Sequence, residues 1–388
     1  MSTKRILAFT GIRSDYDLMS GLYRAIHAHP HLELGLIVTG AHLSPTYGST
    51  IQWIEKDLLP IVARIENLLD SDKPSSRLKS NSILIQSCLH HVEQFNPDVI
   101  LYPGDREDAM AAAQIGAYLA IPTIHFFGGD HSTDGNVDNP VRHAISKLSS
   151  LHFVSHKSHE ERLLKMGESS KRIFLVGSPA LDKFLEESFQ SKKNILRDLN
   201  RPDWEDYAVV IHHPLITCIQ ESGQHFEEIL LALKRVKMKA FVSHPNIDAG
   251  NKQILSMIEK YKNDPDFIFY TTLNRNHFVN LLRHASLMIG NSSAGLMEAP
   301  SIPLGVINVG SRQKGRFAEK NVIFVDPDIN SIIDGIEKVR SGGFQEQLTK
   351  VKSPYGKGDS VKKCLQLLEE LNYSDYQYKR EDPLCNEL

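Results

Sequence analysis

Residues 99–127 read VILYPGDREDAMAAAQIGAYLAIPTIHFF, and this stretch decides the fold class. An apolar run over Asp98–Tyr102 is typical of a buried strand, Glu107–Leu119 has a helical pattern, and Pro122–Phe127 is a second apolar run. Uninterrupted apolar strands joined by a helix are typical of a parallel sheet that helices cover on both faces. The stretch therefore predicts an α/β protein.

The same alternation continues along the chain on both sides of this stretch. Each apolar run ends in Gly, Ser, Asp or His, as a strand that feeds a βα loop does. The pattern dissolves into polar residues over Phe184–Asp206, where we place an interdomain linker. The sequence predicts two doubly wound, Rossmann-like domains at 1–190 and 205–372, and a polar tail at 373–388 whose end is expected to be poorly ordered. The predicted strands are Arg5–Thr10, Leu32–Val38, Leu59–Ile65, Asp98–Tyr102, Pro122–Phe127, Leu151–Ser155, Arg172–Val176, Tyr207–His212, Lys239–Ser243, Phe267–Thr271, Leu287–Gly290, Gly305–Val309 and Val322–Val325.

Composition excludes several classes of partner. The 388 residues carry 44 Lys and Arg against 47 Asp and Glu, a net charge of −3 that disfavours nucleic acid and anionic membranes as partners. Four Cys residues form no CxxC pair, which fits a reducing compartment and disfavours a thiolate zinc site. The apolar run Ile6–Phe9 is too short for a signal peptide or a membrane span, so we expect a cytoplasmic protein.

Motifs for common cofactors are absent from the sequence. No GxGxxG follows the first strand of either domain, and neither GxxxxGK[ST] nor HExxH occurs. Dinucleotide, P-loop and metal sites thereby lose their main support. His27, His29 and His31 lie at a predicted helix C-terminus, where imidazole is electrostatically favourable, and neither they nor the pair His90-His91 are expected to bind a metal.

Candidate residues of the first domain follow its predicted strands, because ligands of doubly wound sheets bind at the strand carboxyl ends and two tandem domains place these ends across a cleft. Arg13 stands at a helix N-terminus, where an anion is favourable. His42 is interpreted equally well as a satisfied loop histidine. Asp105 would cap a helix, but the helix dipole disfavours the neighbouring cation Arg106, which indicates a phosphate or nucleotide contact.

A loop rich in titratable side chains, GGDHSTDGNVDNPVRH, occupies 128–143. Asp138 and Arg142 are spaced i, i+4, so an exposed helix ion pair worth a few tenths of a kcal/mol is the structural alternative. The density of charged groups at a strand end favours a catalytic role. The candidates from this loop are Asp130, Asp138, Arg142 and His143.

The second domain offers nucleotide-binding candidates. His213, held extended by Pro214, can point into the predicted cleft, and a capped loop histidine is the alternative. The segment MIGNSSAGLME at 288–298 joins a strand to a helix through small residues, whose backbone N–H groups and hydroxyls suit a diphosphate. Three cations follow within GSRQKGR at 310–316, for which a solvated charge cluster is the alternative. The candidate phosphate and ribose contacts are Asn291, Ser292, Ser293, Gly295, Glu298 and Arg312.

Taken in order, GIRSDYD, VTGAHL, YPGDRED, GGD, VDNPVRHAISKL, HHP, PNIDAG, GNSSAGLMEAPS and GSRQKGR resemble the hydrolysing UDP-N-acetylglucosamine 2-epimerases, over about Ile6–Val325. The resemblance implies a glycosyltransferase-B-like fold, a cytoplasmic homodimer or homotetramer, a UDP-sugar in the cleft and no NAD or metal in the chemistry. It also implies elimination of UDP through a 2-acetamidoglucal, then addition of water to release N-acetylmannosamine for sialic acid biosynthesis. By resemblance, the acid–base positions are Asp105 and Asp138, the cleft histidine is His213, and the substrate contacts are Arg106, Arg142 and Glu298.

One position departs from the family pattern. Relatives carry a catalytic Glu directly before the Gly-Gly of the loop, where this chain has Phe127. Asp130 is the candidate replacement, and Phe126 with Phe127 would form an apolar wall suited to a 6-deoxy sugar. UDP- or GDP-linked N,N′-diacetylbacillosamine, on a legionaminic acid route, is therefore an alternative substrate. Three competing hypotheses for the function are a non-hydrolysing 2-epimerase of the same fold, a glycosyltransferase and a non-catalytic UDP-sugar sensor.

Overall fold

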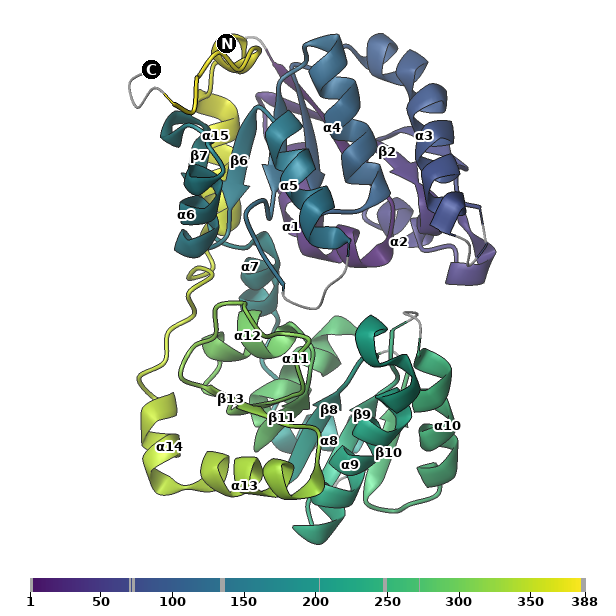
Figure 1. Cartoon of the computed structure of the whole chain (residues 1–388), viewed down its shortest axis with the longest axis vertical. Coiled ribbons are helices and arrows are strands. Elements are labelled where there is room, and N and C mark those ends of the chain that lie inside the picture. Colours follow the sequence, from purple (N-terminus) through teal and green to yellow (C-terminus); the bar gives the residue numbers. More distant parts are fainter. Residues whose placement is uncertain are drawn as a thin grey trace. The chain divides into compact units, whose positions relative to one another are not determined.

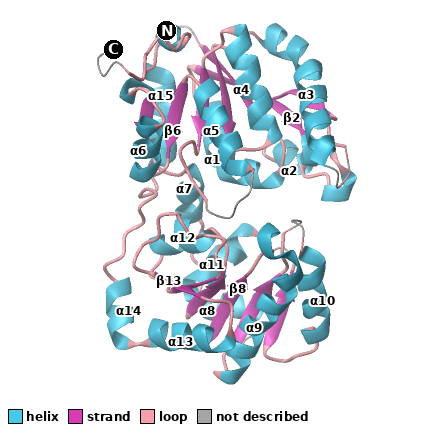
Figure 2. Cartoon of the chain, in the orientation of Figure 1, coloured by secondary structure: helices cyan, strands magenta, loops and turns pink. Residues whose placement is uncertain are grey.

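The computed structural model describes residues 3–69, 71, 74–132, 137–201, 203–246, 250–271 and 273–384. Contacts within the chain divide it into two compact units, each built on one sheet (Figures 1 and 2). The first unit contains the residues up to Asp130, Val137–Lys183 and the C-terminal segment from Tyr355. The second is built mainly from Phe184–Pro354.

The sheet of the first unit has seven parallel strands in the order β3-β2-β1-β4-β5-β6-β7. The order reverses between β1 and β4, and ligands of such sheets bind at the carboxyl ends beside this switch point. The strands are β1 (Lys4–Thr10), β2 (Leu32–Thr39), β3 (Ile61–Ile65), β4 (Val99–Pro103), β5 (Thr123–Phe126), β6 (Leu151–Val154) and β7 (Ile173–Leu175).

Helices cover both faces of this sheet, which explains why its central strands are apolar throughout. Along β1, Ile6 and Ala8 pack into one core with α1, whereas Leu7 and Phe9 pack into another with α3 and α4. The helices of the first unit are α1 (Arg13–His27), α2 (Ile51–Lys56), α3 (Pro74–Phe95), α4 (Glu107–Leu119), α5 (Asp138–Leu148), α6 (Lys157–Lys165) and α15 (Ser360–Glu370). The boundary between the two units falls within α7 (Pro179–Glu186), after Lys183.

The second unit repeats this plan with six parallel strands in the order β10-β9-β8-β11-β12-β13, and its switch point lies between β8 and β11. No helix in the described parts of the chain has an apolar stretch of membrane-spanning length. The strands are β8 (Tyr207–Ile211), β9 (Lys239–Ser243), β10 (Phe267–Tyr270), β11 (Leu287–Gly290), β12 (Val306–Val309) and β13 (Val322–Val325). The helices are α8 (Lys192–Asp198), α9 (Ser222–Arg235), α10 (Asn251–Tyr261), α11 (Arg275–His284), α12 (Ala294–Met297), α13 (Ile329–Arg340) and α14 (Gly342–Leu348).

The predicted fold class, α/β with two Rossmann-like sheets, is confirmed. Every predicted strand is present, with ends that differ by at most two residues. The proposed linker is less irregular than expected: it contains α8, whose Ile195 and Leu196 are buried. Helix α8 is short and mostly polar, so its pattern did not stand out from the surrounding loop.

The C-terminal segment was assigned wrongly. The sequence placed residues up to 372 in the second domain, but α15 belongs to the first unit (Figure 1). It packs against α1, and its Cys364 and Leu368 enter the core. The predicted polar tail is also fastened there, because Glu381 pairs with the buried Arg172, and Lys379 with the buried Glu168. The extreme end of the tail, 385–388, lies outside the described residues.

Candidate active site

The carboxylate of Asp105 lies just beyond the carboxyl end of β4. Its position is set by Gly104, whose N–H donates to Phe126 O at 3.0 Å and whose carbonyl accepts from His125 Nε2 at 2.7 Å. Arg142, on α5, donates from Nη2 to Asp105 Oδ2. The structure thus brings together two candidates from separate segments, one after a strand and one on the following helix.

Arg142 is the buried member of this cluster, with 6% of its surface exposed. Its Nη1 donates to the backbone carbonyl of Asp130 at 3.1 Å, so one guanidinium joins the loops after β4 and β5. The exposed helix ion pair that the i, i+4 spacing allowed is therefore not what holds this side chain. A buried cation between acidic loops can fix a carboxylate in one orientation.

Asp138, the first residue of α5, has its pKa raised by burial and by the charge of Asp105, against the lowering effect of Arg106 and Arg142. A carboxyl group that holds a proton more readily than usual suits the acid of an acid–base pair, and Asp105, held by Arg142, is the neighbouring carboxyl group. The pair Asp105 and Asp138 can therefore divide the roles of base and acid.

Asp130 and His143 turn elsewhere. Asp130 Oδ1 lies 3.4 Å from His159 Nε2, and the backbone carbonyl of Asp130 accepts the hydrogen bond from Arg142. His143 places its Nδ1 2.9 Å from the sulfur of Met166.

His125, which the sequence analysis did not single out, holds the Asp105 loop in place. It is fully buried on β5, and burial lowers its pKa to about 3, which keeps the imidazole neutral. Nε2 donates to Gly104 O, and Nδ1 lies 3.1 Å from Ser146 Oγ of α5. The available signal was one polar residue inside the apolar run Ile124–Phe126.

His42 is a structural histidine. It is fully buried, with Nε2 3.0 Å from Thr10 Oγ1 and Nδ1 2.8 Å from Thr50 Oγ1, so hydroxyls occupy both ring nitrogens. Asp15 caps the start of α1 by accepting the N–H groups of Gly11 and Ile12. This polar network completes the end of β1 and fits the interpretation of His42 as a satisfied loop histidine.

Two arginines remain exposed at the same edge of the first sheet. Arg13 is the first residue of α1, with its guanidinium 5.1 Å from the centre of the Trp53 ring. Arg106 is the residue preceding α4. Both cations stand at helix N-termini, where their charge is not needed by the helix itself and is available to an anion.

Asp108 has a raised pKa that its sequence context did not indicate. Its carboxylate packs against Gly11, where an added Cβ would lie 2.0 Å from Oδ2, and it accepts the hydroxyl of Thr39. Burial, together with the charges of Asp15 and Glu107, raises its pKa from 3.8 to about 6 against the effect of the Thr39 hydrogen bond. The folded chain therefore holds this proton at pH values where the unfolded chain has lost it.

Asp108→Asn should be more stable than the wild type at pH 7–8 and nearly equal at pH 4. Because the folded pKa is the higher one, stability from this group is present below about pH 4 and is lost as pH rises to about 6. The upper limit of the difference is roughly 3 kcal/mol, at about 1.4 kcal/mol per pKa unit. Urea unfolding of both proteins between pH 4 and pH 8 measures this difference in the free energy of unfolding, and Glu346→Gln, at an exposed position, is the control. If the free energies of unfolding of Asp108→Asn and the wild type change with pH in parallel, the prediction is contradicted.

In the second unit, His213 and Asn291 join the carboxyl ends of β8 and β11. The N–H of His213 donates to Asn291 Oδ1 at 2.7 Å, and Asn291 Nδ2 donates back to His213 O at 2.8 Å. The N–H of Asn246 donates to His213 Nδ1 at 3.2 Å, so the neutral ring carries its proton on Nε2. Burial and the charge of Arg312 lower the pKa of His213 to about 3. His213 thus presents a neutral N–H donor.

Gly290 allows these two strand ends to approach. Its φ is 136°, and a Cβ there would lie 2.0 Å from Ile211 O, the carbonyl that accepts the N–H of Asn291. Gly290→Ala should therefore destabilise the protein by about 1–3 kcal/mol through strain and overlap. Thermal unfolding measures this loss. Gly343→Ala, where a Cβ meets no atom within 4 Å, is the matched control, and an equal effect of both changes would refute the argument.

The helix predicted after β11 is short. Helix α12 covers only Ala294–Met297, and Ser292 Oγ accepts the N–H of Ala294 at 3.3 Å. Ser293 is the residue preceding α12. Gly295 packs on Val306, where a Cβ would lie 2.7 Å from Cγ1, so close packing explains this glycine.

Charged groups flank this turn on both sides. Arg312 Nη1 donates to Asn291 O at 3.2 Å, and Gln313 Nε2 donates to the same oxygen at 2.9 Å. Glu298 Oε1 lies 3.9 Å from Arg275 Nη2. The Arg312 contact brings a cation of the 310–316 segment beside the strand end, as a phosphate site requires.

The sequence pattern of one protein family, described as UDP-N-acetylglucosamine 2-epimerase, matches residues 24–369. The chain belongs to this epimerase family. The match runs from within α1 to within α15 and includes every strand of both sheets except β1, so it continues past the last motif that carried the resemblance.

Two curated members of the family cover nearly the whole chain. The UDP-N,N′-diacetylbacillosamine 2-epimerase (hydrolyzing) of Legionella pneumophila is 33% identical over 366 residues, which is 94% of this chain and 96% of the relative. The UDP-N-acetylglucosamine 2-epimerase of Neisseria meningitidis serogroup B is 35% identical over 340 residues, 88% of each chain.

The fold of this epimerase-family chain also matches a solved structure. The UDP-GlcNAc 2-epimerase from Neisseria meningitidis bound to UDP-GlcNAc superposes with a TM-score of 0.80 at 17% identity, covering 95% of this chain and 100% of that one. The likeness confirms the glycosyltransferase-B-like class, in which two Rossmann-like domains occur in tandem.

The sequence predicted an apolar wall formed by Phe126 and Phe127, and this prediction is wrong for Phe126. Phe126 is fully buried in the core of the first unit, so it cannot face a substrate. Phe127 is partly buried and has a φ of 63°, an uncommon conformation for a bulky residue. Any contact with a ligand at this position must come from Phe127 alone.

Proposed function

We propose that this epimerase-family chain is a hydrolysing nucleotide-sugar 2-epimerase that acts on UDP-N-acetylglucosamine and releases UDP and N-acetylmannosamine. The first unit would supply the acid–base groups, and the second would bind the nucleotide. The observation that carries the proposal is the cluster of Asp105, Arg142 and Asp138, because two carboxyl groups with different environments, one paired to a buried arginine, suit proton transfer at a sugar carbon.

The reaction divides into elimination and hydration. In elimination, a carboxylate removes the proton from C2, the C1–O bond breaks with both electrons going to UDP, and a C1–C2 double bond forms. In hydration, water gives one proton to a carboxylate as its oxygen bonds to C1, the double bond opens, and C2 takes a proton from a carboxylic acid. This proton arrives on the face opposite to the one from which the first was removed, which gives the epimer. Asp105 and Asp138 are assigned these proton transfers, and Arg142 orients Asp105.

The leaving diphosphate requires fixed donors and positive charge. In the second unit, the neutral His213 offers its Nε2–H, and Arg312 lies beside the carboxyl end of β11. Ser292 and Ser293 add hydroxyls at the same turn, and Glu298 is assigned to the ribose hydroxyls. In the first unit, Arg13 and Arg106 are the exposed cations assigned to the nucleotide.

Product analysis tests this function directly. The purified chain is incubated with UDP-N-acetylglucosamine, and NMR identifies the sugar while UDP is quantified. Equal amounts of UDP and free N-acetylmannosamine are expected. If the product is UDP-N-acetylmannosamine, with UDP still attached, the chain is a non-hydrolysing epimerase. If UDP is released only when an acceptor is present, the chain is a glycosyltransferase, and if the sugar nucleotide binds without turnover, the chain is a sensor. Each of these three results contradicts the proposal.

UDP-N,N′-diacetylbacillosamine is the second candidate substrate. It is favoured by Phe127, an apolar side chain at the carboxyl end of β5, and by the name of the Legionella pneumophila relative. The same assay with this sugar and its GDP counterpart separates the candidates by kcat/KM. The candidate is discarded if only UDP-N-acetylglucosamine is turned over.

The proposal extends to the setting of the enzyme. We assign it to the cytoplasm, as a homodimer or homotetramer that supplies N-acetylmannosamine for sialic acid biosynthesis. Light scattering on the purified chain measures the assembly, for which two or four copies are expected.

A further inference from the structure

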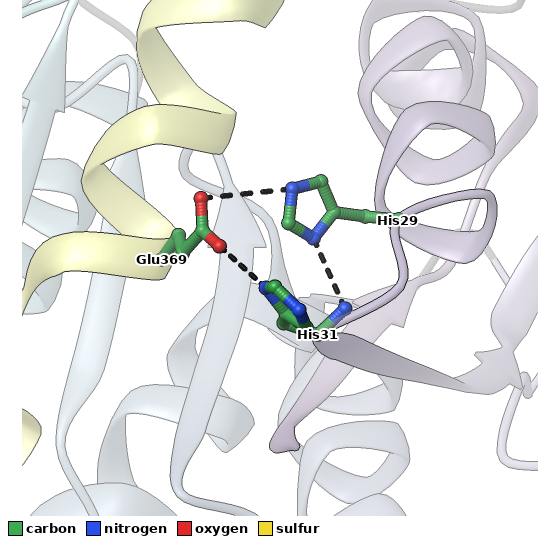
Figure 3. Close-up of side chains that lie close together, drawn as sticks. All are labelled: His29, His31 and Glu369. Carbon is green, nitrogen blue, oxygen red and sulfur yellow. Dashed lines mark hydrogen bonds and ion pairs between the residues drawn. The ribbon is translucent and has the colours of Figure 1, made fainter. Parts of the chain in front are cut away.

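Two histidines and a glutamate from distant parts of the sequence converge in the first unit (Figure 3). His29 and His31 lie between α1 and β2, and Glu369 lies in the last turn of α15. Glu369 Oε1 is 2.7 Å from His31 Nδ1, and Oε2 is 3.7 Å from His29 Nε2. One ligand atom from each residue lies within 4.8 Å of the other two.

This donor set has the chemistry of a transition-metal site. Zn²⁺ binds imidazole nitrogen and carboxylate oxygen at about 2.0–2.2 Å, so tetrahedral ligand atoms lie roughly 3.3 Å apart. The observed separations of 2.7 and 3.7 Å bracket this value. The side chains of His29, His31 and Glu369 are 21%, 48% and 35% exposed, so water can reach the site and complete the coordination. Imidazole ligands favour zinc, copper, iron or nickel over magnesium and calcium.

The tautomer of His29 sets the conditions for binding. Its Nδ1 accepts the N–H of His31 at 3.3 Å, so the neutral ring carries its proton on Nε2. An ion at Nε2 requires the other tautomer, and the long hydrogen bond from His31 is then replaced by water.

Charged groups around the site come from β1 and α15. Lys4 Nζ donates to the carbonyls of Leu368 at 3.4 Å and Leu371 at 2.7 Å, and to that of Glu369. The hydrogen bond from His31, and to a lesser extent the charge of Lys4, lowers the pKa of Glu369 from its usual value. The ammonium of Lys4 is engaged by the carbonyls at the end of α15.

We infer that His29, His31 and Glu369 form a structural site for one divalent first-row transition-metal cation, with water as the remaining ligand. The site lies where β2 begins, at the edge of the sheet opposite to the carboxyl ends that carry Asp105. An ion there would fasten α15, which returns to the first unit from the end of the chain, to the turn after α1. It takes no part in the reaction.

Zinc titration of the chelator-treated full chain tests the site. Calorimetry at pH 7.5 should show one Zn²⁺ per chain, and zinc should raise the unfolding temperature because it binds the folded state. Glu369→Gln, which keeps the size of the side chain, and His31→Ala should each lose the saturable binding and the thermal shift. His90→Ala/His91→Ala removes an adjacent histidine pair without a carboxylate, so it should retain both.

Three results would overturn the inference: no saturable binding by the wild type, undiminished binding by Glu369→Gln, or an anomalous zinc peak in a crystal away from the three side chains. Turnover of metal-free Glu369→Gln should equal that of the metal-free wild type. Loss of turnover in this variant would contradict a purely structural role, whereas failure of the proposed reaction leaves the binding result unaffected.

Discussion

Asp105→Asn should lower kcat by about 10²–10⁴-fold, the usual contribution of a positioned acid or base. Asparagine keeps the shape of the side chain and accepts a hydrogen bond from Arg142, but it cannot take up or deliver the proton at C2. The fold should persist because the loop is held by Gly104 and His125 through its backbone. Release of UDP in steady-state assays measures the effect.

Two matched variants make this result specific. Asp130→Asn changes a carboxylate that faces His159, so its effect on kcat should be much smaller if Asp130 does not replace the family glutamate. Glu346→Gln, on the exposed surface of α14, should leave turnover unchanged. Equal losses for Asp105→Asn and Asp130→Asn would show that the geometry around Arg142 does not identify the catalytic carboxylate.

Arg142→Met should cost both stability and activity. The change leaves the carboxylate of Asp105 without its buried partner, and removal of one member of a buried ion pair costs about 3–5 kcal/mol; the partial exposure of Asp105 places the expected loss near 3 kcal/mol. Turnover should fall at least as far as in Asp105→Asn, because the carboxylate loses its orientation.

Arg142→Lys separates charge from geometry. Lysine keeps the positive charge, but its single ammonium cannot bond Asp105 and the carbonyl of Asp130 with the spread of a guanidinium. Urea unfolding should show most of the stability retained, while kcat stays low. Full activity in Arg142→Lys would mean that the simultaneous contacts of the guanidinium with Asp105 and the carbonyl of Asp130 are unimportant.

The sheets were predictable because their strands are covered on both faces. In β1, neighbouring residues such as Leu7 and Ala8 enter different cores, so the whole strand is apolar and stands out from the helices. Short polar helices such as α8 have no long apolar run or clear helical period that separates them from loops, so they were not predicted.

Candidate residues were found where a strand end fixes their position. Asp105 follows β4 directly, and Asp138 begins the helix after β5, so the topology alone places them at one edge of a sheet. Partners were not predictable. The i, i+4 spacing indicated an ion pair between Asp138 and Arg142, whereas in the structure Arg142 pairs with Asp105 on another loop.

Contacts between distant segments were also beyond the sequence. Nothing in the polar spacing of α15 indicates that Glu369 reaches His31, 338 residues away. His125 shows the same limit, because a buried histidine reveals its role only through the carbonyl that it bonds. Periodicity reports which face of an element is buried, but not what covers that face.

The route of the chain has a consequence for biosynthesis. The apolar face of α1 is covered in part by Cys364 and Leu368, which the ribosome adds only after every strand of the second unit. The second unit can therefore fold during translation, while α1 of the first unit stays without this cover until α15 has been made. This waiting period makes the nascent first unit the part of the polypeptide that chaperones have most reason to shield.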